Sequence, residues 1–425
     1  MKVLLIGSGG REHAIYWKIL QSSKLEEIYV YPGNGGIQEE HRLRKETYGD
    51  LFKDNFLGLK KFILDKEIDL VIVGPEQPLV DGIVDFLQDI CLVFGPNQHG
   101  ARIEGSKSFA RSFMDRFGIP SAKFQVFNDF KKAIEYLEEI SPPYVIKADG
   151  LAAGKGVTVT NDKQEAIQSI KDILENKVFG NYPLLIEEFL PGKEASVFAF
   201  CDGEKAILMK AARDYKRAYD KNQGPNTGGM GSVTPVEYID SSLMDYIQKE
   251  IFDRTIDGFK KLNISYKGIL YAGLMIHNHS AKVVEFNCRF GDPEIQALLP
   301  LLDEDLLDLC FHAASGTLSK NKSHISFKNL SSMTVVVAAE GYPKSYKKEI
   351  DLTNFLKNIP EDLIVFHAGT EYNLETRQYY SNGGRILNIT ATGNTIDEVR
   401  NKIYPFLDQN PIPNTFYRKD IGILY

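Results

Sequence analysis

The sequence predicts a protein of several domains that belong to the α/β and α+β classes. The chain has 425 residues, which corresponds to about three domains at roughly 150 residues each. Its first hundred residues alternate short apolar runs with helical stretches, and later regions place strands and helices in other orders. Hydrophobic residues make up 43% and charged residues 25% of the chain, so wholesale disorder and a fibrous repeat are both excluded.

The charge balance and the cysteines exclude several classes of partner. The 50 basic and 57 acidic residues give a net charge of −7, so we expect no nucleic acid partner. The four cysteines form no C-x-x-C pair, which argues against structural zinc and disulfides and indicates a reducing compartment. No apolar run reaches the roughly 18 residues of a membrane span. We therefore expect a soluble, cytoplasmic protein with small-molecule partners and no membrane contact.

Residues 1–119 are predicted to form a doubly wound parallel-sheet domain. Four short apolar runs, separated by helical stretches, each end in a Gly or Pro turn: 3–6, 28–31, 70–73 and 91–94. Wholly apolar runs are typical of parallel strands that helices cover on both faces. A ligand is expected at the carboxyl ends of these strands, where the turns lie.

A second, compact unit is predicted for residues 120–191. A helix follows Asn128, with apolar side chains at helical spacing through 130–137. Asn161 is the expected N-cap of a second helix. Strands are expected at 144–146, 157–159 and 184–186. Two helices on a small sheet make a compact subdomain.

The remaining chain divides into two further units. Residues 192–325 are strand-rich at first and then helical, and the polar stretch 319–323 resembles a linker. Residues 326–425 are predicted to form a small mixed α/β domain, in which Thr395 and Glu398 have the spacing of a capping box and predict the start of a helix. Its strands are expected at 334–338, 364–367 and 385–390.

The glycine-rich loop at residues 7–13 follows the first strand and opens a helix, which is the context of a dinucleotide-binding fingerprint. Two features differ from that fingerprint: Glu12 stands at the third glycine position, and no acidic residue follows the second strand. The loop still offers backbone N–H groups to an anion, so a phosphate-bearing substrate is favoured. A tight turn without any ligand is the alternative.

A second glycine-rich loop, residues 150–156, resembles a Walker loop that is one residue short. Gly156 stands where Ser or Thr would bind magnesium, so the loop is not a P-loop. Because it lies between two expected strands, it could fold over a triphosphate, with Lys147 and Lys155 supplying charge. A flexible hairpin with two solvated lysines is the alternative.

The most informative segment is the expected strand around residue 285. Alternation along a strand places Glu285, Asn287 and Arg289 on one face. A carboxylate and an amide oxygen are hard ligands suited to a Mg²⁺ shared with phosphates. Arg289 could stabilise charge that develops on a phosphoryl group or an acyl oxyanion. An edge strand with an exposed polar face and an ordinary Arg–Glu pair is the alternative.

Five segments together resemble the phosphoribosylamine–glycine ligase family, also called glycinamide ribonucleotide synthetase, of the ATP-grasp superfamily. They are 3–14 (VLLIGSGGREHA), 74–83 (GPEQPLVDGI), 147–157 (KADGLAAGKGV), 224–231 (GPNTGGMG) and 289–294 (RFGDPE). The resemblance extends over essentially the whole chain. It implies an N-terminal domain and an ATP-grasp core with a mobile lid subdomain, a catalytic subdomain and a small C-terminal domain, with the boundaries given above.

The resemblance also implies a reaction. ATP, glycine and 5-phosphoribosylamine would give glycinamide ribonucleotide, ADP and phosphate, an early step of purine biosynthesis, through a glycyl phosphate intermediate. Because an acyl phosphate is hydrolysable, a closing lid would have to exclude water. The family further implies Mg²⁺ or Mn²⁺ as the metal and a monomeric enzyme.

Carried over position by position, the resemblance implies roles for individual residues. Contacts to ATP are implied for Lys107, Lys147, Gly150, Gly154, Lys155, Gly156, Glu187 and Leu190 (adenine) and Glu194 (ribose). Metal ligation is implied for Glu285 and Asn287, and catalytic roles for Arg289, Asp292, Asp214 and Lys216. Substrate binding is implied for Gly9, Gly10, Arg11, Glu12, Gly228 and Gly229, of which the first four lie in the loop that would face phosphoribosylamine.

The chain departs from the family pattern at a few positions, and other functions stay open. Arg213 and Tyr215 replace a Gln and a His, and 221–223 replaces an acidic-glycine stretch. The expected strand 270–276 carries no second metal-binding carboxylate, so the number of metal ions is open. The alternatives are another ATP-grasp ligase, a dinucleotide-dependent oxidoreductase built on the first glycine loop, and a non-catalytic nucleotide sensor.

Overall fold

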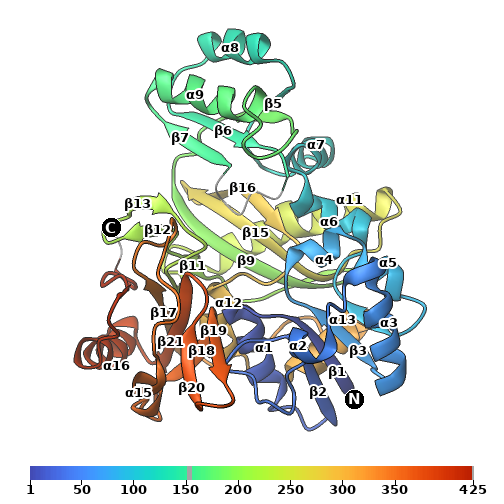
Figure 1. Ribbon diagram of the computed structural model, residues 1–425. Coiled ribbons are helices and arrows are strands. Elements are labelled where there is room, and N and C mark those ends of the chain that lie inside the picture. The colour runs from blue at the N-terminus through green and yellow to red at the C-terminus, as the bar shows by residue number, and fades with distance from the viewer. Residues whose placement is uncertain (151–155, 424–425) are drawn as a thin grey trace.

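The computed structural model describes residues 1–150 and 156–423. An α/β part comes first, followed by a small subdomain that projects from the rest and then by a larger body that ends in a C-terminal sheet (Figure 1). The predicted mixture of α/β and α+β architecture is confirmed. The predicted site residues Gly154 and Lys155 lie outside the described residues.

The N-terminal part is built on a four-stranded sheet in the order β2-β1-β3-β4, in which every pair is parallel. Its strands are β1 (Lys2–Gly7), β2 (Glu27–Pro32), β3 (Leu70–Val73) and β4 (Leu92–Phe94). They coincide with the four apolar runs of the sequence, so the doubly wound unit is confirmed. Its helices are α1 (Gly10–Ile19), α2 (Lys45–Tyr48), α3 (Lys53–Lys66), α4 (Glu76–Val80), α5 (Ile83–Leu87), α6 (Gln98–Gly105) and α7 (Lys107–Phe117).

The projecting subdomain has an antiparallel sheet in the order β5-β8-β6-β7. Its strands are β5 (Phe124–Phe127), β6 (Tyr144–Ala148), β7 (Val157–Thr160) and β8 (Leu184–Glu187), and α8 (Phe130–Glu139) and α9 (Lys163–Leu174) cover one face. The predicted N-cap Asn161 is wrong by one residue, because the Asp162 carboxylate accepts the hydrogen bond from Gln164 N, at 2.8 Å. We call this unit the lid subdomain.

The central sheet is antiparallel and has the order β10-β9-β15-β16. Its strands are β9 (Lys193–Asp202), β10 (Ala206–Leu208), β15 (Lys267–His277) and β16 (Ser280–Asn287). One face packs on the helical segment that contains α10 (Ser241–Ile247), a π-helical stretch (Gln248–Asp253) and α11 (Arg254–Lys261). The other face contributes Phe198 and Phe200 to a core shared with the N-terminal sheet.

Helices α12 (Glu294–Leu298), α13 (Leu306–Ser315) and α14 (Leu318–Asn321) follow the central sheet. A 3₁₀ turn (Leu299–Leu301) continues α12. The predicted linker at 319–323 is therefore wrong in its first half. The physical reason is that Leu318 is completely buried and anchors this turn of helix, while Ser319 N donates to Asp202 Oδ2 at 2.7 Å.

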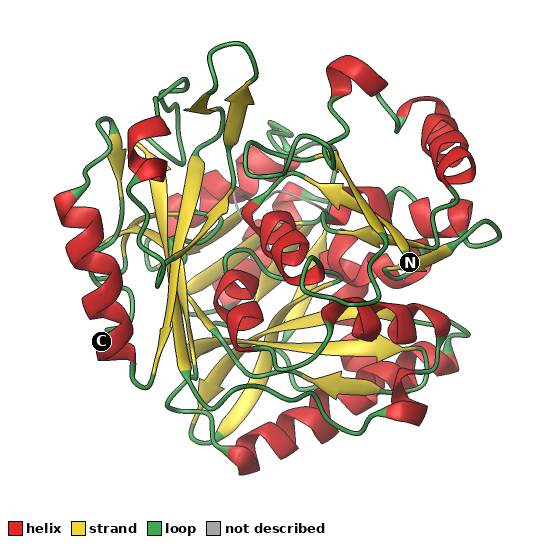
Figure 2. Ribbon diagram, turned by 90° about the horizontal axis from the view of Figure 1, so that it is seen from below, coloured by secondary structure: helices red, strands yellow, loops and turns green. Residues whose placement is uncertain are grey.

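The C-terminal sheet has the order β11-β14-β17-β21-β18, and β22 (Thr415–Phe416) pairs with β17. Its strands are β11 (Arg213–Asp214), β14 (Gly231–Thr234), β17 (Ser331–Ala339), β18 (Ile364–His367) and β21 (Arg385–Gly393). The sheet thus spans the predicted boundary at residue 325, and the predicted domain division stays a prediction. Figure 2 shows α16 (Ile396–Gln409) lying along this sheet. Thr395 caps α16 as predicted.

Smaller elements complete the fold. They are the hairpins β12–β13 (Arg217–Tyr219, Gln223–Asn226) and β19–β20 (Thr370–Asn373, Gln378–Ser381) and the helix α15 (Thr353–Lys357). None of the helices in the described part of the chain has the length and apolar content that a membrane crossing requires.

Two buried histidines join the N-terminal and C-terminal parts. His13 on α1 and His367 at the end of β18 have ring centroids 5.3 Å apart, and His367 N donates to His13 Nδ1 at 2.7 Å. Burial, and then the charge of His367, lower the pKa of His13 well below its usual value. Burial lowers the pKa of His367 to about 4. Both rings are therefore neutral at pH 7.

The free energy of unfolding is expected to fall as the pH drops below about 6.5, because the unfolded chain then binds protons that the two buried rings exclude. The stabilisation is complete above the unfolded pKa and is lost as the pH falls toward 4. At pH 5 the loss from His367 alone is about 2 kcal/mol, because its folded pKa is about 4. Urea unfolding at pH 7.5 and pH 5 measures it. His367→Asn should reduce the difference, and an unchanged difference would contradict the assignment.

Candidate active site

A β-bulge sets the direction of the predicted metal ligands. Gly273 of β15 pairs with Glu285, whereas its neighbour Leu274 pairs with Val283, so Val284 is an extra residue in β16. Before the bulge Val283 faces the core, and after it Phe286 does. Without the extra residue Glu285 would point into the core. The bulge turns Glu285 and Asn287 to the opposite face, as the predicted alternation of residues 285 and 287 requires.

Glu285 is held by two nearby cations. Lys216 Nζ lies 3.4 Å from Glu285 Oε1 and 3.7 Å from Glu194 Oε2. Lys216, followed by Lys147, lowers the pKa of Glu285 to about 2 against the effect of burial. Burial by itself would lower the pKa of Lys216, but Glu285 and Glu194 raise it well above its usual value. The acid is therefore ionised at neutral pH, and its side chain is 45% exposed.

Two lysines of the predicted phosphate site stand close to Glu285. Lys147 lies on β6, and Lys107 is the first residue of α7. Burial lowers the pKa of each, and Glu285 acts on both in the opposite direction. Lys107 Nζ donates to Gly150 O at 2.7 Å, and its backbone N donates to Asp149 Oδ1 at 2.6 Å. The start of α7 is thus tied to the beginning of the second glycine loop.

The predicted adenine contact Glu187 is buried in a three-charge cluster. Its carboxylate accepts two hydrogen bonds from Arg111, at 2.7 and 2.6 Å, and lies 2.7 Å from Lys147 Nζ. Arg111 also donates to Val283 O and Val284 O, at 3.1 and 2.7 Å. The guanidinium therefore connects the lid strand β8 to the bulge that orients Glu285.

Arg289 follows β16 and forms ion pairs with two acids of the N-terminal part. Its guanidinium lies 3.2 Å from Glu76 Oε2 and 2.9 Å from Glu104 Oε1. Burial raises the pKa of Glu104, which the charge of Arg289 opposes. Burial also acts to raise the pKa of Glu76, but Arg289 and Arg11 bring it below its usual value. These two acids fix the direction of Arg289.

A pocket of about 480 Å³ lies between the N-terminal loop and the C-terminal domain. Gly9 and Gly10 line one side, and Arg385 lines the other. Asp292 stands between them, with Oδ1 3.2 Å from Arg385 Nη1 and Oδ2 accepting from Arg11 N at 3.2 Å. The same guanidinium donates to Gly228 O at 2.5 Å. The predicted residues Gly228 and Gly229 therefore contact a pocket-lining side chain without being part of the lining.

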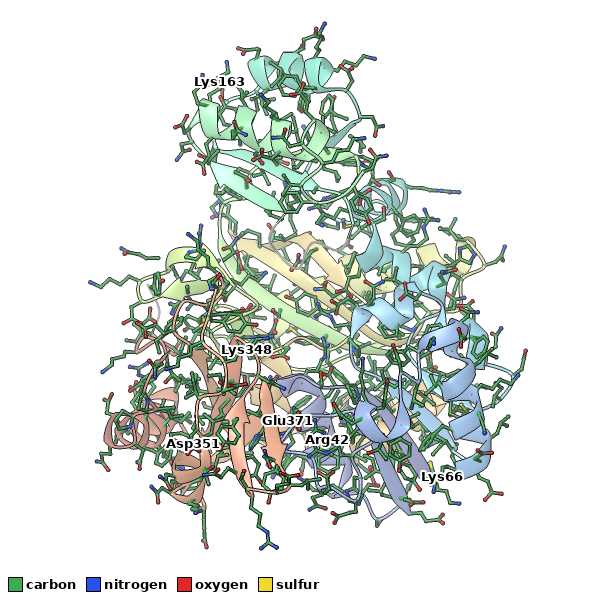
Figure 3. All side chains as sticks on the ribbon, in the orientation of Figure 1. Arg42, Lys66, Lys163, Lys348, Asp351 and Glu371 are labelled. Carbon is green, nitrogen blue, oxygen red and sulfur yellow. The ribbon has the colours of Figure 1, made fainter. Side chains whose placement is uncertain are left out.

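The rest of the pocket wall includes an ion pair between the two parts. Arg42 donates to both carboxylate oxygens of Glu371, at 2.7 and 2.8 Å. Figure 3 shows these two labelled side chains where the N-terminal and C-terminal parts meet. Both residues line the pocket, together with Lys45.

Glu12 holds the glycine loop through a hydrogen bond from Gly9 and does not line the pocket. Its buried carboxylate accepts from Gly9 N at 2.6 Å and from Arg11 Nε at 2.5 Å. A Cβ on Gly7 or Gly74 would lie within 2.3 Å of the Glu12 side chain, which explains the glycines at these two positions. Neither Arg11 nor Glu12 lines the pocket, although the resemblance implies that both contact substrate.

Asp214 on β11 is a partly buried acid near Lys216. Among the described residues its Oδ1 has no hydrogen-bond partner, and a Cβ on Gly229 would lie 2.7 Å from this atom. Burial, followed by the negative charge of Glu294, raises the pKa of Asp214 well above its usual value. The raised pKa makes this carboxylate a stronger base than an ordinary aspartate.

Most of the sequence-predicted residues therefore lie in two adjoining regions, a charged one around Glu285 and the pocket at Asp292. Sequence reasoning missed several side chains that complete them: Arg111, Glu76, Glu104, Arg42 and Arg385. Glu76 carries a sequence signal, because it stands in the GPEQPLVDGI segment after a strand. The others have no local motif, since each acts on a residue that is distant in the sequence.

Family models match almost the entire chain. They are the N domain of phosphoribosylglycinamide synthetase at residues 1–104, its ATP-grasp (A) domain at 105–295 and its C domain at 332–423. A phosphoribosylamine–glycine ligase of Leptospira interrogans is 45% identical over 426 residues, 99% of this chain and 98% of the relative.

Solved structures agree with the family models. A phosphoribosylamine–glycine ligase from Thermotoga maritima has a TM-score of 0.82 and 33% identity, covering 99% of this chain and 100% of that one. The biotin carboxylase domain of a Hydrogenobacter thermophilus 2-oxoglutarate carboxylase, determined with MgADP, has a TM-score of 0.72 at 15% identity over 98% and 91% of the chains, and shares the fold. On these matches, this chain belongs to the phosphoribosylglycinamide synthetase family of ATP-grasp ligases.

Proposed function

We propose that this chain ligates glycine to 5-phosphoribosylamine, forming glycinamide ribonucleotide, ADP and phosphate in purine biosynthesis. The observation that carries the proposal is the continuity of the segment 285–292. It places Glu285 beside Lys216 and Lys147 at one end and Asp292 in the 480 Å³ pocket at the other. An acyl phosphate formed at the first end would lie near an amine bound at the second.

The nucleotide is proposed to bind between the lid subdomain and the central sheet. Lys107 and Lys147 would contact the phosphates. Leu190 follows β8 and would lie against the adenine. Glu194 pairs with Met275 and faces the same side of the central sheet as Glu285. It would bind the ribose hydroxyls. The Glu187 carboxylate already binds Arg111 and Lys147. Glu187 would therefore lie near the adenine, at the end of β8, without binding it through the carboxylate.

The metal site is proposed at Glu285 and Asn287. An ionised, half-exposed carboxylate and an amide oxygen on one strand face suit a Mg²⁺ or Mn²⁺ that keeps water and phosphate oxygens as its other ligands. Such an ion would neutralise charge on the nucleotide phosphates. Gly273 stands directly opposite Glu285, so β15 supplies no further carboxylate at this point.

The reaction is proposed to take two steps. In the first, a glycine carboxylate oxygen bonds to the terminal phosphorus and ADP leaves, while Lys216 and Arg289 stabilise the added negative charge. In the second, the amine nitrogen attacks the acyl carbon, phosphate leaves and the nitrogen loses a proton. Asp214 would accept that proton, since burial and Glu294 raise its pKa. Asp292 would orient the ammonium group of glycine or the incoming amine.

The pocket is proposed to take the phosphoribosyl group. Lys45 and Arg385 offer cationic side chains to its phosphate, and Gly9 and Gly10 offer close backbone approach at the N-terminus of α1. Closure of the lid subdomain would protect the acyl phosphate from water. The domain division, a monomeric state and a cytoplasmic location remain predictions of the same proposal.

A coupled ADP-release assay over a panel of amines and carboxylates tests the proposed function. ADP should appear only when glycine and phosphoribosylamine, generated in the assay, are both present. Equal ADP release with formate or bicarbonate in place of glycine would overturn the assignment in favour of another ATP-grasp ligase. Tight binding of NADH, measured by NADH fluorescence, would instead favour a dinucleotide-dependent oxidoreductase.

A further inference from the structure

The segment 418–423 binds a hairpin that lies far away in the sequence. The hairpin is β12–β13, and hydrogen bonds that involve Arg418 and Asp420 join it to the segment. Arg418 has a completely buried side chain and donates to both carboxylate oxygens of Asp420, each at 2.7 Å. The same guanidinium donates to Arg217 O at 3.0 Å and to Asn222 Oδ1 at 3.1 Å.

One backbone N–H group of the hairpin turn and one of the segment 418–423 add further hydrogen bonds to this contact. Lys221 N donates to Asp420 Oδ2 at 2.8 Å, and Lys419 N donates to Asp220 Oδ1 at 2.8 Å. Lys221 and Asn222 both have positive φ values, +57° and +55°, as the two central residues of this turn. The turn is therefore held in one conformation from outside as well as by its own strands.

Tyr215, just before the hairpin, contacts the same segment. Its hydroxyl donates to Ile423 O at 3.2 Å and accepts from Gly422 N at 3.0 Å. The guanidinium groups of Arg213 and Arg418 lie over its ring, 4.6 and 5.1 Å from the centroid.

The two ends of the hairpin lead directly to proposed site residues. Lys216 precedes β12 and reaches Glu285 and Glu194. After β13, Thr227 donates to Lys216 O through both its backbone N and its hydroxyl, each at 2.8 Å, and Gly228 O accepts from Arg385. A shift of the hairpin would therefore move the lysine and the pocket contact together.

We propose that residues 418–423 form a clasp that holds the β12–β13 hairpin, and that Tyr215 and Asn222 are positioning residues which act through it on Lys216 and Gly228. The role in catalysis rests on the proposed function, whereas the clasp itself does not. Residues 418–423 would thus act on the site from a distance, because none of them lines the pocket.

Hydrogen exchange of the full-length protein tests the clasp without any substrate. In Tyr215→Phe, which keeps the ring and removes two hydrogen bonds, the amides of residues 217–226 should exchange about three- to tenfold faster than in the parent protein. Tyr219→Phe is the matched control, because Tyr219 lies in the same hairpin and is 51% exposed. Unchanged exchange in Tyr215→Phe would overturn the clasp.

Kinetics test the positioning role. Asn222→Gly tolerates the positive φ but loses the acceptor for Arg418, and Asn222→Asp keeps that acceptor. We expect Asn222→Gly to lower kcat/KM for phosphoribosylamine about three- to tenfold, with KM for ATP unchanged, and Asn222→Asp to restore it. Faster exchange with unchanged kcat/KM in Asn222→Gly and Tyr215→Phe would overturn the positioning role. An equal rise in the KM for ATP and the KM for phosphoribosylamine would also overturn the positioning role.

Discussion

Replacing Glu285 with alanine is expected to lower turnover on the order of 100-fold or more, because the variant loses the proposed metal ligand and the partner of Lys216. Folding should be little affected. The side chain is 45% exposed, so its removal opens no cavity, and Lys216 keeps Glu194 at 3.7 Å. The free energy of unfolding should therefore change by less than about 1 kcal/mol. Steady-state kinetics at saturating substrates and urea unfolding measure the two effects.

Glu204→Gln provides the matched control for Glu285. Glu204 is a 67% exposed acid after β9 that forms an ion pair with Lys260 at 2.9 Å, far from the proposed site. Its replacement should leave turnover unchanged. Titration with Mn²⁺ should also show weaker metal binding in Glu285→Ala than in this control. Near-normal turnover of Glu285→Ala at saturating Mg²⁺ would rule out the proposed ligand role.

Lys147→Met is expected to weaken ATP binding about 10- to 150-fold, the equivalent of a charge-assisted hydrogen bond of about 1.5–3 kcal/mol. The fold should tolerate this change for two reasons. Methionine is long enough to fill the space of the buried lysine stem, and Glu187 keeps its two hydrogen bonds from Arg111. Calorimetric titration with a non-hydrolysable ATP analogue measures the loss.

Lys163→Met is the control on the same subdomain. Lys163 lies at the surface of the lid, where Figure 3 labels it, and forms an ion pair with Glu138. Its removal should change analogue binding by less than about twofold. If Lys147→Met bound the analogue as tightly as this control does, the phosphates would have to lie elsewhere.

The main strands are predictable because each is a local, strongly apolar run. The runs at 3–6 and 70–73 are short, wholly apolar and bounded by Gly or Pro turns, which favours strands buried on both faces of a parallel sheet. Helix starts are harder to predict, since adjacent polar residues compete for the cap. Asp162 takes this role instead of its neighbour Asn161. The stretch 319–323 differs from its prediction because the residue that anchors it, Leu318, lies one position outside it.

The site shows the same division between local and long-range causes. The types and spacing of Glu285, Asn287 and Arg289 favour phosphate chemistry, but an edge strand with an ordinary Arg–Glu pair fits the same three residues. The partners that orient these side chains cannot be inferred from spacing. Arg111 reaches Val284 O across 173 positions of sequence, and Arg385 reaches Asp292 O across 93. A sequence motif records which groups are present, while a hydrogen bond between distant segments leaves no periodic trace.

The sequence by itself determined the class of fold, the positions of its main strands and the set of oxygen and nitrogen groups available to a nucleotide and a metal. Only the tertiary structure decided which way those groups point. One extra residue at Val284 turns Glu285 out of the core, and Glu12 fills the space that two glycines leave. The physical reason is that the direction of a side chain depends on strand register and on contacts between distant segments, whereas strand formation depends on neighbours along the chain.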